Sequence, residues 1–315
     1  MHGPDVSRRG PGVARFPTNP IIRPDMDARM GTNVNGPSLI RVPEWVPSPL
    51  GRYYLYFAHH DGRYIRLACA DDLAGPWRTH EPGVLSLAEA GFAGHVASPD
   101  VHVDEERRQI RMYFHGADAP SGPAPRERPG VLPRPSDGGL AGQHSRAALS
   151  ADGLAFEARP ELLGRPYFRV VGWRDWWLAL GMPGVFYRSR DGLTGFEEGP
   201  TLFGPDQRHT ALALDGDTLS VFYTNAGDLP ERILRSTIAL SDDWTTWRAS
   251  PPTVVLEPET EYEGGHLPLE RSRRGLVERP VRQLRDPGVF REGGRTYLLY
   301  AVAGESGIAI AELKE

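Results

Sequence analysis

The sequence predicts an all-β fold, a five-bladed β-propeller with four antiparallel strands in each blade and a ring that an N-terminal strand closes. Two observations lead to this prediction. The 315 residues include 36 glycines and 30 prolines, which favour many short strands joined by tight turns. One local pattern also returns roughly every fifty residues, which is typical of propeller blades.

The recurring pattern is a serine or aspartate, a short turn, and then an aromatic residue. Asp and Gly suit the tight turn, and the aromatic ring anchors the next strand in the core. Four copies occur, at residues 71–77, 150–156, 189–196 and 241–247. We interpret the aspartates that recur with the repeat as turn formers, namely Asp71, Asp152, Asp191 and Asp243.

Short apolar runs around these turns predict the four strands of each blade. The innermost strands are predicted at residues 37–42, 99–103, 166–171, 210–214 and 287–290. The second strands are predicted at residues 53–58, 110–115, 176–180, 219–224 and 296–302. The third strands are predicted at residues 64–70, 145–149, 184–188, 233–240 and 307–313. The outer strands are predicted at residues 83–87, 160–163, 200–203 and 252–256.

The fifth blade has no outer strand of its own at the end of the chain. Residues 19–24 match the missing strand in pattern, so we expect this segment to complete the blade. Ring closure of this kind hides the edges that an open sheet would expose. Five copies in register argue against the alternative of an ordinary β-sandwich.

The composition is that of a globular protein, with 39% hydrophobic and 24% charged residues. A net charge of -5 argues against nucleic acid or an anionic membrane as the main partner. The single cysteine, Cys69, lies in an apolar run and is interpreted as core filler, and no intrachain disulfide can form.

The first residues carry no targeting signal that we recognise. Residues 1–12 are polar and lack the apolar stretch of a secretory signal, and no apolar run is long enough to span a bilayer. We therefore expect a cytoplasmic protein with a disordered tail over residues 1–18 and a single propeller domain over residues 19–315.

The strand directions of a blade place the functional loops on one face. The start of each innermost strand and the hairpin between the second and third strands share this face. The innermost strands bring to it Asn35, His95, Asp100, Arg165, His209, Arg285 and Asp286. The hairpins add His59, His60, Asp61, His115, His144, Arg146 and Glu305. Such groups are costly to bury without partners, so their recurrence at equivalent positions indicates a ligand.

Plainer interpretations stay open for several of these residues. Asp100 and Asp286 could accept hydrogen bonds from the backbone of neighbouring blades, and a single histidine is usually structural. The long linker at residues 257–266 carries Glu263, which either reaches over the axis or belongs to a solvated acidic loop. The loop at residues 118–142 is either a mobile lid or disordered.

Three short phrases carry a resemblance to a known group. They are Ser98-Pro99-Asp100-Val101, Arg285-Asp286-Pro287 and Gly75-Pro76-Trp77. With the blade pattern over residues 19–315, the chain resembles the five-bladed propeller glycosidases of glycoside hydrolase families 43 and 32. The resemblance implies three carboxylates in an axial cleft, acting as general acid, general base or nucleophile, and pKa modulator. Asp100 matches the modulating aspartate.

Two positions depart from the pattern of that group. Blade one reads Asn35-Gly36-Pro37 where the basic aspartate is expected, and blade three reads Gly164-Arg165-Pro166 where the acidic glutamate is expected. Neither side chain can replace a carboxyl group at neutral pH. The acids would then come from Asp286, Glu263 or Asp61, or a histidine would donate the proton, as the related anhydrogalactosidases look to do.

We expect a glycoside hydrolase that acts on a small oligosaccharide or terminal glycosyl residue. Asp286 is expected as base or nucleophile, Glu263 as general acid and Asp100 as pKa modulator. The substrate would be bound by Asn35, His95, Arg165, His209, Arg285 and the predicted hairpin residues. No cofactor is expected, although the sequence leaves room for a structural or axial divalent cation, and the oligomeric state stays open.

Two other functions compete with hydrolysis. A metal-dependent enzyme would use the candidate ligands His59, His95, His115, His144, His209 and Asp100. No His-x-His or Glu-x-x-His spacing fixes such a site. A sugar-binding propeller without catalysis would fit the missing acids of blades one and three.

Overall fold

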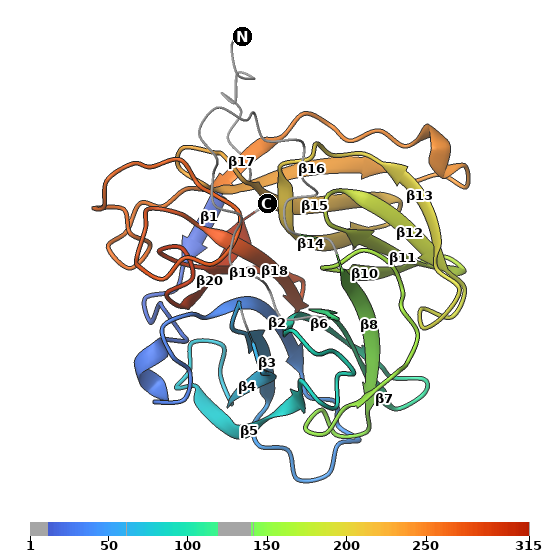
Figure 1. The fold of residues 1–315 in the computed structure, drawn as a ribbon, viewed down its shortest axis with the longest axis horizontal. Helices are drawn as coiled ribbons and strands as arrows, with labels where there is room; N and C mark the ends of the chain where they lie inside the picture. The colour runs from blue at the N-terminus through green and yellow to red at the C-terminus, as the bar shows by residue number, and fades with distance from the viewer. Residues whose placement is uncertain (1–11, 61, 119–139, 141, 315) are drawn as a thin grey trace.

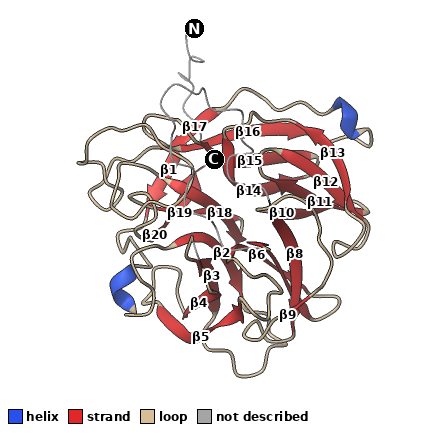
Figure 2. Cartoon of the chain, in the orientation of Figure 1, coloured by secondary structure: helices blue, strands red, loops and turns tan. Residues whose placement is uncertain are grey.

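The computed structural model describes residues 12–60, 62–118, 140 and 142–314. Within these residues, twenty strands form five separate four-stranded antiparallel sheets. The sheets are arranged around a common axis as the blades of a propeller (Figure 1). Figure 2 shows how little helix accompanies them, and the two 3-10 turns of the described chain are η1 (Pro24–Met26) and η2 (Trp244–Thr246). The predicted fold class is confirmed.

The strands nearest the axis are the first of each blade in chain order. They are β2 (Asn35–Arg41), β6 (Val96–Asp104), β10 (Arg169–Trp173), β14 (Gln207–Asp215) and β18 (Arg285–Glu292). The second strands are β3 (Tyr53–Ala58), β7 (Gln109–Ala117), β11 (Trp176–Gly181), β15 (Thr218–Asn225) and β19 (Arg295–Ala301). Both sets lie where the apolar runs predict them.

The remaining strands lead to the rim. The third strands are β4 (Tyr64–Ala70), β8 (Gln143–Ser150), β12 (Val185–Ser189), β16 (Ile233–Ala239) and β20 (Ile308–Lys314). The outer strands are β5 (Arg78–Ser86), β9 (Glu157–Ala158), β13 (Glu197–Thr201), β17 (Thr253–Leu256) and β1 (Gly12–Arg15). In blade two the outer strand is short and precedes the predicted residues 160–163.

An N-terminal strand closes the ring, as predicted, but a different segment forms it. β1 pairs with β20 from Gly12 opposite Lys314 to Arg15 opposite Ala311. The expected residues 19–24 make only an isolated bridge, Ile22 with Ile308. Two prolines in that segment lack the N–H that a strand needs, whereas residues 12–15 contain none. The strand therefore lies inside the predicted tail, of which residues 1–11 are outside the described residues.

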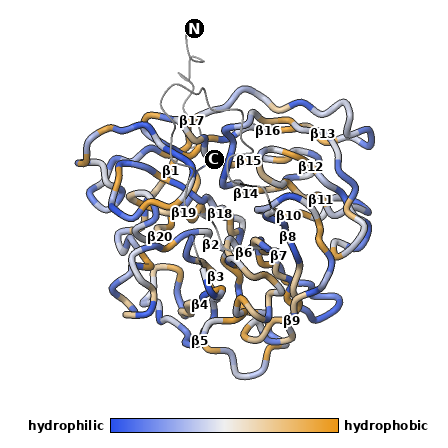
Figure 3. The backbone as a smooth tube through the Cα atoms, in the orientation of Figure 1, coloured by the Kyte–Doolittle hydropathy of each residue, from blue (hydrophilic) through white to orange (hydrophobic). Residues whose placement is uncertain are grey.

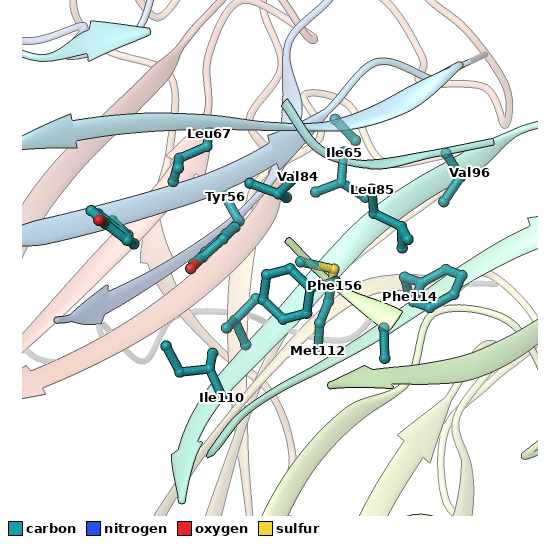
Figure 4. Packing of buried hydrophobic residues seen from close by; sticks show 14 of the residues in the cluster. Tyr56, Ile65, Leu67, Val84, Leu85, Val96, Ile110, Met112, Phe114 and Phe156 are labelled. Atoms are coloured by element: carbon teal, nitrogen blue, oxygen red, sulfur yellow. The ribbon is translucent and has the colours of Figure 1, made fainter. Parts of the chain in front are cut away.

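The blades adhere through apolar side chains at their faces. Figure 4 shows this packing between blades one and two, where Tyr56 and Leu67 lie near Met112 and Phe156. Phe156 comes directly after one copy of the recurring turn and is buried, which confirms the predicted anchor. Cys69 is buried in the same cluster as a free thiol.

The five inner strands begin with the same backbone kink. One residue at each start has a positive φ, and the five are Gly36, Ser98, Tyr167, His209 and Asp286. In blades one, two, four and five this residue lies within a shift of the strand register. A positive φ is strained for side chains other than glycine. The kink thus marks the face on which the inner strands begin, called here the top face.

Two residues beyond the kinks of blades one, two and three, polar side chains tie one blade to the next. Ser38 of β2 accepts a hydrogen bond from the Val101 amide at 2.8 Å, and Asp100 of β6 accepts one from the Val170 amide at 2.8 Å. Arg169 of β10 is buried and donates to the carbonyls of Pro99 and Thr210. These bonds hold the inner strands at fixed positions around the axis.

We predict that Arg15→Ala lowers the free energy of unfolding by about 3 kcal/mol. Arg15 Nε lies 2.7 Å from Oε1 of Glu263, whose side chain is fully buried, so the substitution leaves a buried carboxylate without its cation. Thermal or urea unfolding measures the change. Arg23→Ala removes an exposed pair with Asp25 and should change stability little. Equal effects of the two substitutions would contradict the prediction.

Candidate active site

A chain of buried charges runs beneath the top face from blade four to blade five. Arg208 of β14 binds Glu231 through two hydrogen bonds of 2.9 and 2.5 Å. Nε of Arg285 lies 3.2 Å from the same Glu231, and Nη1 of Arg285 donates to Glu305 at 2.9 Å. All four side chains are 2% exposed or less. They alternate in sign, so each buried charge has a partner.

The far end of this chain, Glu305 of blade five, contacts blade one. Glu305 accepts hydrogen bonds from the side-chain amides of Asn33 and Asn35. Nδ1 of His60 lies 3.5 Å from it. Burial raises the pKa of Glu305, but His60, Arg285 and Asn33 outweigh burial and hold that pKa well below its ordinary value. Glu305 therefore stays ionised and joins three predicted residues, Asn35, His60 and Arg285, into one cluster.

Glu231 is equally fixed in its ionised form. Burial raises its pKa, yet Arg208 and Arg285 outweigh burial and keep the pKa below the ordinary value. Thr224 also donates to Oε1 of Glu231 at 2.7 Å. The two glutamates thus place two fixed negative charges beneath the top face.

Asp286 differs from both glutamates because it has no direct cation. Its Oδ1 accepts a hydrogen bond from the Tyr167 hydroxyl at 2.5 Å, and its Oδ2 has no hydrogen-bond partner among the described residues. The residue is 2% exposed and has a positive φ. Burial raises the pKa of Asp286, and the nearby charge of Glu305 adds to the rise, to about 6. A strained, buried carboxyl group with one oxygen that lacks a hydrogen-bond partner is typical of a functional site.

A row of rings crosses the top face beside Asp286. The ring centres of His95 and His115, of His115 and Tyr167, and of Tyr167 and His209 are 5.5, 5.7 and 5.6 Å apart. Burial lowers the pKa of both His115 and His209 well below the ordinary value, and neighbouring charges such as Arg208 beside His209 lower it further. Both imidazoles are neutral at neutral pH, which disfavours them as proton donors.

Most residues of this cluster could be found from topology, although not all were singled out. The structure brings together Asn35, His60, His95, His115, His209, Arg285, Asp286 and Glu305 of the predicted set. Sequence reasoning placed Asn33, Tyr167, Arg208 and Glu231 in the segments that line this face but did not single them out as site residues. These four lie at the starts of inner strands or in the same hairpins, so their position was the available signal.

Two predicted catalytic residues lie elsewhere. Asp100 is two residues beyond the kink, where it binds the Val170 amide and Nε2 of His102, both at 2.8 Å. It lines a cavity of about 1110 Å³ that the inner strands form beyond the top face. Its plainer interpretation as a link between blades therefore fits the contacts. Because the charged cluster gathers at the strand starts and not in this cavity, we place the candidate site on the top face.

Glu263 does not reach over the axis. One oxygen binds Arg15 and the Tyr300 hydroxyl, at 2.7 and 2.9 Å, and the other accepts the amides of Glu259 and Thr260. Burial raises the pKa of Glu263, and these hydrogen bonds outweigh it and lower the pKa. A carboxylate with four donors fastens the linker to the closing strand, and it is poorly suited to donate a proton.

The other predicted residues have mixed positions. Arg165 is exposed, and the guanidinium of Arg146 covers the ring of Phe92 at 4.6 Å. His59 and His144 are half-buried. Asp61 lies outside the described residues, as does most of the predicted lid at residues 118–142. The described contacts do not join Arg146, Arg165 or His144 to the charged cluster.

The connection between blades four and five, residues 257–284, crosses the top face. Its Ser272 hydrogen-bonds the backbone of Gly227 and Asp228, and Arg274 donates to the Pro205 carbonyl. Figure 3 shows hydrophilic chain near the axis beside β10 and β14, which is consistent with a polar site in the middle of the molecule.

Among the described residues, no group of three or more His, Cys, Asp or Glu residues is placed to hold a metal ion. The axial cation stays a prediction. No helix in the described part of the chain combines the length and apolar character of a membrane span.

Comparisons with solved structures define the class of fold. A β-xylosidase/α-arabinofuranosidase of glycoside hydrolase family 43, from a compost microbial metagenome and in complex with xylotriose, superposes with a TM-score of 0.58 at 13% identity, over 98% of this chain and 95% of that one. An N-acetylgalactosamine deacetylase from F. plautii gives a TM-score of 0.55 at 14% identity, over 96% and 94%. The chain therefore has the five-bladed propeller fold of the family 43 glycosidases.

Sequence comparison places the chain more narrowly. The uncharacterized protein R118 of Acanthamoeba polyphaga mimivirus is 36% identical over 338 residues, which cover 96% of this chain and 90% of the relative. The chain belongs to the same family as R118. A scan against models of known protein families finds no match.

We predict that Asp286 makes the protein less stable as the pH rises from about 4 to about 6. Its pKa is raised from 3.8 to about 6 on folding, so in this window the folded state holds a proton that the unfolded state has lost. Asp286→Asn should flatten this part of the stability curve, as measured by urea unfolding between pH 4 and pH 7. An unchanged slope would contradict the raised pKa.

Proposed function

We propose that this protein is a glycosidase that cleaves a terminal glycosidic bond at the top face, with Asp286 as the general acid. The fold supports the proposal, because the propellers of family 43 that share it include a β-xylosidase/α-arabinofuranosidase bound to xylotriose. Fold likeness alone does not assign an activity, so the proposal depends on the site.

The observation that carries the proposal is the contrast between Asp286 and the two glutamates. Glu231 and Glu305 are ionised and held by arginines. Asp286 instead has a raised pKa and one oxygen without a hydrogen-bond partner among the described residues. Glycoside hydrolysis needs a carboxyl group that is protonated at the leaving oxygen while nearby charge stabilises the oxocarbenium-like transition state. Asp286 supplies the proton as the glycosidic C–O bond breaks, and the glutamates supply fixed negative charge. A water molecule then adds to the anomeric carbon and returns a proton to Asp286.

This assignment moves the acid from its expected place. Sequence analysis expected Asp286 as base or nucleophile and Glu263 as acid. We now assign the acid to Asp286, because a carboxyl with a pKa of about 6 is partly protonated at neutral pH and Glu263 is fully hydrogen-bonded.

Neutral groups around Asp286 would orient the sugar. The side-chain oxygen of Asn35 is buried without a hydrogen-bond partner among the described residues, so it can accept from a sugar hydroxyl. The neutral rings of His115, Tyr167 and His209 form a surface against which the apolar face of a sugar can lie.

We predict that Asp286→Asn lowers kcat/KM by about a hundredfold or more on an aryl glycoside that the unaltered protein hydrolyses, because general acid catalysis is lost. In the unaltered protein, activity should fall as the pH rises through about 6, where Asp286 loses its proton. A panel of aryl glycosides assayed between pH 4 and pH 9 measures both effects.

Asp100→Asn is the matched control, since Asp100 is an inner-strand aspartate that links blades without joining the charged cluster. It should retain activity at temperatures where the protein stays folded. Undiminished activity of Asp286→Asn would refute the assignment. Sugar binding without turnover of any glycoside would favour the competing function of a sugar-binding propeller.

A further inference from the structure

A second cavity opens on the top face beside the charged cluster. It has a volume of about 410 Å³, which is in the range of small-molecule sites. It lies where blade four begins, between the chain that leads into β14 and the hairpin that follows β15. The side chains important to its chemistry are Phe203, Asp206, Gln207, Tyr223, Asn225 and Asp228.

Strand pairing connects this cavity to Asp286. Gln207 and Asn225 pair across β14 and β15, and the next pair is Arg208 with Thr224, which both bind Glu231. Two residues beyond Gln207, Nδ1 of His209 lies 3.9 Å from Oδ2 of Asp286. The cavity therefore adjoins the proposed acid and the fixed glutamates.

The cavity has free acceptors for hydroxyl groups. The carboxylates of Asp206 and Asp228 make no hydrogen bond or ion pair within the described part of the chain. Gln207 is 1% exposed and donates through Nε2 to Thr210, while its Oε1 has no partner there. A buried amide oxygen that lacks a partner in a polar cavity indicates a missing donor.

The remaining features favour an uncharged sugar. The rings of Phe203 and Tyr223 meet edge to face at 5.0 Å and give the cavity an apolar wall. Burial raises the pKa of Asp228, and the charges of Glu231 and Asp206 add to that rise, which outweighs the opposing charges of Arg232 and Arg271. The same negative surroundings disfavour an anionic ligand. Among the described residues that line the cavity, Arg271 is the one cation, and it donates to the Gly227 carbonyl at 2.5 Å and thereby fixes the hairpin.

We propose that this cavity binds the second unit of a neutral oligosaccharide whose terminal unit lies at Asp286. The inference rests on the proposed function, which places the terminal sugar unit at Asp286. It adds that the substrate is a neutral sugar of more than one unit. An oligosaccharide of uronic acids is excluded by the free carboxylates.

The test measures binding and not turnover, so its outcome does not depend on whether Asp286 is the catalytic acid. Isothermal titration calorimetry would use neutral trisaccharides of pentoses and hexoses, with trigalacturonic acid as the anionic probe. We expect the double variant Asp206→Asn/Asp228→Asn to bind the neutral trisaccharide about tenfold more weakly or worse, because hydrogen bonds to charged acceptors are lost. Trigalacturonic acid should bind the unaltered protein at least about tenfold more weakly than the neutral sugar.

Asp175→Asn is the control, because Asp175 is an exposed aspartate in the turn between β10 and β11, away from the cavity. It should bind as the unaltered protein does. Asp206 is exposed, so Asp206→Asn alone carries the test if the double variant does not fold. Unchanged binding by a folded cavity variant overturns this inference but leaves the proposed acid intact. Failure of the unaltered protein to bind any neutral trisaccharide overturns it as well.

Discussion

The buried guanidinium of Arg285 is the interaction on which the top face depends. It is fully buried between Glu231 and Glu305, and removal of either glutamate would leave charge unpaired in the interior. Through these contacts it joins the hairpins of blades four and five, and through Glu305 it reaches Asn33 and Asn35 of blade one. Charge pairing thus links loops of three blades on the top face.

The same pairing determines which carboxyl group can do chemistry. Glu231 and Glu305 cannot give up their charge without leaving an arginine buried alone. Asp286 lies among these charges but binds a neutral tyrosine hydroxyl in place of a cation. Burial and the fixed negative charge of Glu305 therefore favour its protonated form. The network that stabilises the loops also separates the pKa values of its acids.

The site shows how a shared fold can carry a rearranged set of groups. The glycosidases that the chain resembles are expected to place carboxylates at the starts of blades one and three, where this chain has Asn35 and Arg165. Here the buried carboxylates gather at blades four and five. Propellers of this fold also include an N-acetylgalactosamine deacetylase, so the position of the acids, and not the fold, has to identify the reaction.

The sequence by itself determined the five blades and nearly every strand, because turn residues and apolar runs are local signals that repeat. It also placed the functional face, which follows from strand direction. It could not distinguish the roles of Asp100 and Asp286, because both stand beside a proline at the start of an inner strand. The kink falls on Asp286 in blade five but on Ser98 in blade two, two residues before Asp100. Strand register decided which carboxyl group meets the charged cluster and which one binds the next blade, and that register exists only once the strands have paired.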